Sequence, residues 1–303
     1  MLWSFRLILG VSLAAVSLAA CQATPTPGPA PASPPRVVAT FSVLGDLVQR
    51  VAGGRVALTI LVGPDSDTHS YEPTPGDTRA LADAQVIFAN GAGFEPWLAG
   101  LVTAARTAPP PILVTDGLAL LSAGPDEVDP HVWQSVANVR RIVARIEAAL
   151  TAADPAHAAD YQANAAAYQR ELAALDADLA AQIQALPVER RKLVTNHDTF
   201  AYLARDYGFV IVGDALGGAS TEGSEPSAAE IAALAEAVRA QGVPAVFAEN
   251  IGQAGVLERI AQEAGVTLGP RLYTDALSAA GGPADTYLAL MRYNVAAIVG
   301  ALR

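Results

Sequence analysis

Two pairs of residues in this chain are candidate metal ligands. His69 and His131 lie in the first half of the chain, and His197 and Asp275 lie in the second half. Imidazole nitrogens and carboxylate oxygens are ligands that divalent transition metals accept. Taken one at a time, a loop histidine is more often a surface residue, and an aspartate before a small residue is as often a turn residue as a ligand. His69 and His131, two of only four histidines in the chain, lie after comparable predicted strands, and this favours a shared site.

The segments before these residues decide where the side chains can meet. Each of the three histidines follows a predicted strand, and Asp275 follows the last extended stretch of the chain. The strands that precede the histidines are predicted at residues 56–62, 112–115 and 192–195. Ligands of parallel α/β sheets bind beyond the carboxyl ends of the strands. The positions of the four residues are therefore those expected of a binding site.

Strand-like apolar runs alternate with helical patterns in both halves of the chain. The predicted strands are residues 36–41, 56–62, 86–89 and 112–115 in the first half, and residues 192–195, 209–212, 245–248 and 266–268 in the second. Helices are predicted between them, two of which begin with capping residues, Thr74 and Ser227. This alternation predicts an α/β fold with parallel sheets that carry helices on both faces.

A long helical stretch separates the two halves. Residues 155–186 are rich in Ala, Leu, Gln, Glu and Arg and contain no Gly or Pro after Pro155, which predicts a helix about 45 Å long. Asp154 is its predicted cap. The apolar positions recur at three- and four-residue steps and are Tyr161, Tyr168, Leu172, Leu175, Leu179, Ile183 and Leu186. A plain core or coiled-coil helix would show the same stripe, but the similar patterns on either side favour a rigid link between two lobes.

The composition excludes several classes of protein and site. A chain of 303 residues fits two domains better than one. The net charge of −11 argues against a nucleic-acid partner. The single cysteine, Cys21, excludes an intrachain disulfide and a cysteine-based zinc site.

The N-terminus has the pattern of an export signal. Residues 1–20 contain Arg6 and then an apolar stretch that is too short for a convincing membrane span. Leu-Ala-Ala-Cys at 18–21 resembles a bacterial lipobox, in which Cys21 becomes the lipidated first residue; an ordinary signal peptide with an incidental cysteine is the alternative. Residues 21–35 are rich in proline and predict an extended tether of roughly 40 Å. We therefore expect an extracytoplasmic protein that is anchored to the membrane, in the periplasm or on the outer face of the cell membrane.

Several stretches, taken in order, resemble the metal-binding solute-binding proteins of bacterial zinc and manganese ABC transporters, known as cluster A-I. They are DTHSYEPTP at 67–75, DPHVW at 129–133, TNHDTFAY at 195–202, EPS at 225–227, VFAE at 246–249, LYTD at 272–275 and MRYN at 291–294. Each stretch is weak alone, but the ordered set covers essentially the whole chain after the tether and is specific.

The resemblance implies two Rossmann-like lobes joined by a single long rigid helix, with a metal ion between them. The implied parts are an N-terminal lobe at 36–153, a linking helix at 154–186 and a C-terminal lobe at 187–303. Family ligands map onto His69, His131, His197 and Asp275, one from each motif. Glu72 and Glu249 also lie in family motifs but are not expected to bind the metal directly.

The same resemblance implies a monomeric receptor that captures a divalent metal and delivers it to an ABC permease, and not an enzyme. Many manganese-specific relatives carry Glu where this chain has His197, so a third imidazole favours Zn²⁺ over Mn²⁺. The absence of a long His-rich loop, which many zinc-specific relatives carry, keeps manganese as the alternative. A surface adhesin and a zinc hydrolase are two further alternatives. The hydrolase is disfavoured because the chain has no His-Glu-x-x-His motif.

Overall fold

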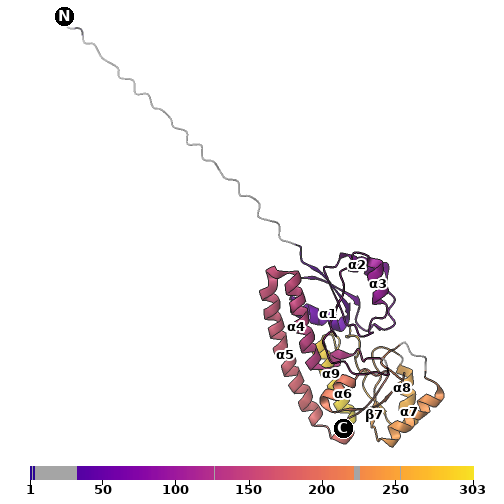
Figure 1. Cartoon of the computed structure of the whole chain (residues 1–303). Helices are drawn as coiled ribbons and strands as arrows, with labels where there is room; N and C mark the ends of the chain where they lie inside the picture. The colour runs from indigo at the N-terminus through magenta and orange to yellow at the C-terminus, as the bar shows by residue number, and fades with distance from the viewer. Residues whose placement is uncertain (2, 4–32, 126, 222–225, 253) are drawn as a thin grey trace. The chain divides into compact units, whose positions relative to one another are not determined.

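The computed structural model in Figure 1 describes residues 1, 3, 33–125, 127–221, 226–252 and 254–303. Cys21, the rest of the predicted lipobox and most of the predicted tether lie outside these residues. Within the described residues, no helix is both long and apolar enough to cross a membrane. Residues Pro34–Arg303 cluster as one unit, and the lobe boundaries within it stay a prediction.

The first sheet has four parallel strands in the order β2-β1-β3-β4. The strands are β1 (Arg36–Phe41), β2 (Ala57–Val62), β3 (Val86–Ala89) and β4 (Ile112–Leu113). The central strand β1 is buried after its first residue, as expected for a parallel strand that is covered on both faces. The helices of this region are α1 (Ser42–Ala52), α2 (Pro75–Asp83), α3 (Leu98–Ala105) and α4 (Val136–Ala153). The predicted capping box of α2 is present, because Thr74 and Asp77 bond each other's backbone N–H groups.

The second region repeats the alternation with shorter strands. The parallel pairs are β5 (Lys192–Thr195) with β6 (Val210–Asp214) and β7 (Ala245–Val246) with β8 (Thr267–Leu268). The helices are α6 (Ala201–Tyr207), α7 (Ala228–Ala240) and α8 (Ala254–Ala264). A hydrogen bond of 2.9 Å from the Phe247 N–H to the Val194 carbonyl oxygen connects the two pairs. The α/β fold with parallel sheets is therefore confirmed.

The long helix is present, although its ends differ from the prediction. Pro155–His157 forms a 3₁₀ turn, and the α-helix α5 covers Ala158–Gln184. Asp154 makes no capping hydrogen bond with its side chain. Its carboxylate contacts the Tyr161 hydroxyl and the His157 ring, both at 2.7 Å. All seven apolar positions of the predicted stripe are buried. Helix α5 packs along α4, which runs beside it in Figure 1, and also against α1 and α9.

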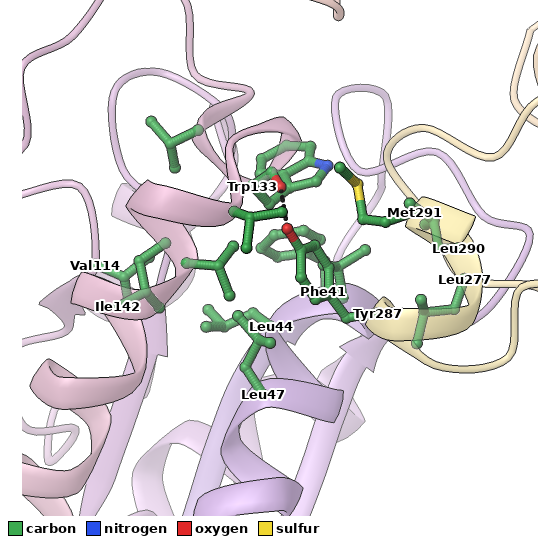
Figure 2. Packing of buried hydrophobic residues seen from close by; sticks show 14 of the residues in the cluster. Phe41, Leu44, Leu47, Val114, Trp133, Ile142, Leu277, Tyr287, Leu290 and Met291 are labelled. Atoms are coloured by element: carbon green, nitrogen blue, oxygen red, sulfur yellow. Dashed lines mark hydrogen bonds between the residues drawn. The ribbon is translucent and has the colours of Figure 1, made fainter. Parts of the chain in front are cut away.

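The last helix, α9 (Tyr287–Leu302), packs against α1 and α5. Figure 2 shows Tyr287 and Met291 of this helix beside Phe41 and Trp133 of the first region. The buried Tyr287 hydroxyl donates a hydrogen bond of 2.8 Å to the Trp133 carbonyl oxygen. The C-terminal end of the chain therefore contributes to the core next to the first sheet.

Candidate metal centre

The structure brings the four sequence-predicted side chains together. His69 lies in the loop between β2 and α2, His131 lies just before the 3₁₀ turn Val132–Gln134, and His197 lies between β5 and α6. Asp275 follows Leu272, which forms a parallel bridge with Glu249. One ligand atom from each of the four lies within 4.8 Å of the others, and all four residues are buried.

The carboxylate of Asp275 is the common neighbour of the three imidazole rings. Its Oδ2 atom lies 3.3 Å from Nε2 of His69 and 3.2 Å from Nε2 of His197. Its Oδ1 atom lies 3.7 Å from Nε2 of His131. The three Nε2 atoms and Asp275 Oδ2 are buried and have no hydrogen-bond partner among the described residues. Buried polar atoms are normally paired, so converging lone pairs of this kind fit a bound cation.

Two further carboxylates orient the rings from behind. Asp129 Oδ1 lies 2.7 Å from Nδ1 of His131 and also accepts the backbone N–H of His131 at 2.9 Å. Glu249 Oε2 lies 2.7 Å from Nδ1 of His197 and accepts the Thr274 hydroxyl at 2.8 Å. A proton held at Nδ1 leaves the Nε2 lone pair free to bind a metal.

These contacts give Glu249 a role that agrees with its predicted place outside the direct ligands, while Glu72 is exposed and belongs to no ligand cluster. The role of Asp129 was not predicted from the sequence. A signal for it was present, because Asp129 precedes His131 by two residues and carboxylates commonly support metal-binding histidines.

The acidic neighbours give the rings of His131 and His197 a high affinity for protons when no metal is bound. Burial lowers the pKa of His131, but the Asp275 and Asp129 carboxylates outweigh burial and raise it to about 9. Burial likewise opposes protonation of His197, yet Glu249 and Asp275 hold its pKa well above the ordinary value. Burial raises the pKa of Asp275, but His197 and His131 together hold it well below the usual range. Protons and a metal ion therefore compete for the same nitrogens.

Two aromatic side chains from the first region of the chain, Phe94 and Trp133, pack against the imidazole rings of His69 and His131. The ring centroid of Phe94 lies 4.8 Å from that of His69 and 6.0 Å from that of His131. The indole of Trp133 lies 5.3 Å from His131, and its Nε1 donates to the carbonyl oxygen of Thr274, next to Asp275, at 2.9 Å. These contacts limit rotation of two rings and tie the segment that carries Asp275 to the segment that carries His131.

A cavity of about 420 Å³ leads from the surface to His69. Its lining comes from both regions of the chain and includes Gly93, Glu127, Val128, Ala219 and Ser220. Of the four converging residues, only His69 lines this cavity. An ion that enters here would meet His69 first.

Replacing Asp129 with Asn tests the support behind His131. We expect metal affinity to fall by about 10- to 100-fold, because the amide no longer fixes the ring or raises its basicity. Asp154→Asn is a matched control, since Asp154 contacts His157 Nδ1 at the same 2.7 Å but lies outside the cluster. Isothermal titration should show normal affinity for the control, and equal losses in both variants would contradict a specific role for Asp129.

Comparisons with known proteins agree with a metal centre. Residues 37–301 match the family described as the periplasmic component A of the zinc-uptake complex. The manganese-binding lipoprotein MntA of Halalkalibacterium halodurans is 32% identical over 271 residues, which are 88% of each chain. The iron ABC transporter substrate-binding lipoprotein MtsA of Streptococcus pyogenes is 29% identical over 95% of each chain. The solved structure of the periplasmic zinc-binding protein TroA of Treponema pallidum superposes with a TM-score of 0.84 at 33% identity, covering 89% of this chain and 99% of that one.

Proposed function

Since this chain belongs to the family of the periplasmic zinc-uptake component A, we propose that it captures a divalent transition-metal ion outside the cytoplasm and delivers it to an ABC permease. The observation that carries this proposal is the convergence of three buried Nε2 atoms and one buried carboxylate within 4.8 Å. The Nε2 atoms and Asp275 Oδ2 have no hydrogen-bond partner among the described residues. In this proposal the ion is cargo. One chain supplies all four ligands, so a monomer is sufficient.

Binding without catalysis fits the ligand set better than hydrolysis does. A catalytic zinc commonly has three protein ligands and keeps its fourth position for water. Here a fourth protein group, Asp275, lies within 3.3 Å of two imidazole nitrogens and would fill that position. The site would therefore enclose an ion on all sides instead of presenting it to a substrate.

Zinc is the metal that we propose, with manganese as the alternative. Three imidazoles and one carboxylate match the tetrahedral shell that zinc prefers. Manganese prefers more oxygen ligands and ranks below zinc in the general affinity order for such sites. The relative MntA is named for manganese, and Asp275 could add a second oxygen to the shell, because its Oδ1 lies 3.7 Å from His131 Nε2.

The residue that discriminates between these metals is His197. We expect His197→Glu to shift the ratio of zinc to manganese affinity toward manganese, because the change replaces a nitrogen ligand with an anionic oxygen. Competition titration with both metals would measure this ratio in each form. A wild-type chain that prefers manganese at equal free concentrations would overturn the zinc assignment and leave the receptor role intact.

Delivery is tested in cells. In the native host, deletion of the gene should reduce the uptake of radioactive zinc, and the wild-type chain should restore it. The His131→Ala chain, expressed at the same level, should not. Equal restoration by both chains would contradict the proposal that the His131 site carries the cargo.

The anchor is proposed from the Leu-Ala-Ala-Cys signal at 18–21. Cys21→Ser should abolish lipid attachment and move the protein from the membrane fraction to the soluble extracytoplasmic fraction. Metal affinity should not change, because residues Pro34–Arg303 cluster as a unit of their own and contain all four proposed ligands. Membrane fractionation and labelling with a radioactive fatty acid would measure the effect. An unchanged membrane fraction for the variant would contradict the lipobox interpretation.

A further inference from the structure

The loop that carries His69 is bonded to the segment that carries Asp275 at a point away from the metal centre. The contact is made by Asp65, four residues before His69. Its backbone N–H donates to the Leu277 carbonyl oxygen at 2.9 Å. Its carboxylate accepts two hydrogen bonds of 3.1 Å, from the backbone N–H of Ala279 to Oδ2 and from the amide of Asn250 to Oδ1.

The backbone of Asp65 has a conformation that few side chains adopt. Its φ of 51° lies in the left-handed region, where glycine is the common residue and aspartate is tolerated. Glycine would meet the backbone requirement with less strain, but it has no carboxylate. The two long-range hydrogen bonds of the Asp65 carboxylate are therefore the feature that distinguishes aspartate here from the glycine that the backbone favours.

The partners of Asp65 hold Asp275 and His197 in turn. The Asn250 amide accepts the backbone N–H of Thr274 at 3.2 Å and donates to the Ala276 carbonyl oxygen at 3.3 Å, so it bonds the residues on both sides of Asp275. Asn250 also follows Glu249 directly, and Glu249 contacts the His197 ring.

The other partner segment is anchored in the core. The Leu277 N–H donates to the Ser42 hydroxyl at 3.0 Å, and the buried Leu277 side chain belongs to the same hydrophobic cluster as Leu290 of α9 (Figure 2). Asp65 thus connects the His69 loop to the Asp275 segment, which is itself bonded to Ser42 and buried in the core at Leu277.

We propose that Asp65 is a positioning residue that fixes the His69 loop against the Asp275 segment, so that metal is held in a pre-formed site and leaves slowly. The inference rests on the proposed metal-binding function. If the two segments moved apart freely, only a fraction of molecules would have the ligands in place, and the apparent affinity would fall by that fraction. Asp65 acts through these segments, because it belongs to no ligand cluster itself.

The direct test is the rate of zinc dissociation from Asp65→Gly. Glycine keeps the left-handed backbone and removes both carboxylate bonds, so we expect dissociation to be faster by roughly tenfold, as two lost hydrogen bonds imply. The rate is measured by stopped flow with an excess of chelator. The absorption spectrum of the Co²⁺-loaded chain should keep its band positions, because all four proposed ligands remain.

Two further variants separate positioning from general stability. Glu230→Ala removes half of the α7 capping box, whose described hydrogen bonds do not reach the His69 loop, and should lower the melting temperature without changing the dissociation rate. Asp65→Asn retains the side-chain shape and one acceptor oxygen, so it should give an intermediate rate even if Asp65→Gly folds poorly.

Two results would overturn the proposed role of Asp65 and leave the metal-binding function untouched. One is an unchanged dissociation rate in both Asp65→Gly and Asp65→Asn, and the other is an equal acceleration in Glu230→Ala. Failure of the wild-type chain to bind zinc, manganese or iron would instead contradict the proposed function.

Discussion

The His131→Ala variant should lose metal affinity by about 10²- to 10³-fold. Structural zinc sites bind with about 10–16 kcal/mol shared among four ligands, so each ligand contributes a few kcal/mol. His131 is fully buried, and its removal also leaves the Asp129 carboxylate without the ring that it contacts. The loss should therefore exceed that of Asp129→Asn, which keeps the ligand itself.

The matched control is His157→Ala. His157 contacts Asp154 at 2.7 Å, as His131 contacts Asp129, but its side chain is 39% exposed and belongs to no ligand cluster. Isothermal titration of chelator-treated protein with zinc should give wild-type affinity for this variant. If His157→Ala loses as much affinity as His131→Ala, the assignment of the ligands is wrong.

Zinc affinity should fall steeply as the pH is lowered through a range in which a free histidine side chain is still neutral. The carboxylates raise the pKa of His131 to about 9, and they also raise that of His197, so a metal must displace protons from the empty site below about pH 9. Each displaced proton lowers the apparent affinity up to tenfold per pH unit. Between about pH 9 and 6.5, His131 alone should account for a loss on the order of a hundredfold.

Titrations in buffers of different ionisation enthalpy would measure both the affinity and the number of protons released. If the rings had the reference pKa of imidazole, about 6.5, zinc affinity would fall only at pH values near and below about 6.5. An affinity that stays constant from pH 9 to 7, without proton release, would contradict protonated rings in the metal-free site.

The stability of the metal-free chain should fall as the pH rises, whereas its zinc affinity should increase. The folded-state pKa of His131 is above its unfolded value, so its interaction with Asp275 and Asp129 stabilises the fold fully below about pH 6.5 and is lost as the pH rises to about 9. The Asp275 contribution is constant over this range, because its lowered pKa lies far below it. Calorimetry should therefore show the metal-free melting temperature falling, and the increase on adding zinc growing, across the same window.

Local sequence patterns predicted the segments that position the ligands. Strands such as Arg36–Phe41 and Lys192–Thr195 have the predicted bounds. Apolar runs that are bounded by turn residues leave little choice of where a strand begins and ends. The capping boxes at Thr74 and Ser227 are also present, since both of their partners lie within four residues.

The connections between distant segments could not be predicted in this way. Glu249 lies behind His197, and Asp65 bonds Leu277 and Ala279, but no local pattern links residues 52 to 214 positions apart. The packing of α9 against α1 depends on the same kind of long-range contact. The four ligand candidates were found because family motifs surround them. Their mutual distances required the structure.

The most direct test of a metal site is the metal content of the chain from Pro34 onward after equilibration with limiting zinc and removal of free metal. Mass spectrometry with an inductively coupled plasma should find about one zinc ion per wild-type chain, and only background in the double variant His131→Ala/Asp275→Ala. The native fold of the double variant is checked by circular dichroism. A folded double variant that retains as much zinc as the wild type, or a wild type that retains none of the divalent transition metals, would contradict the proposed metal site.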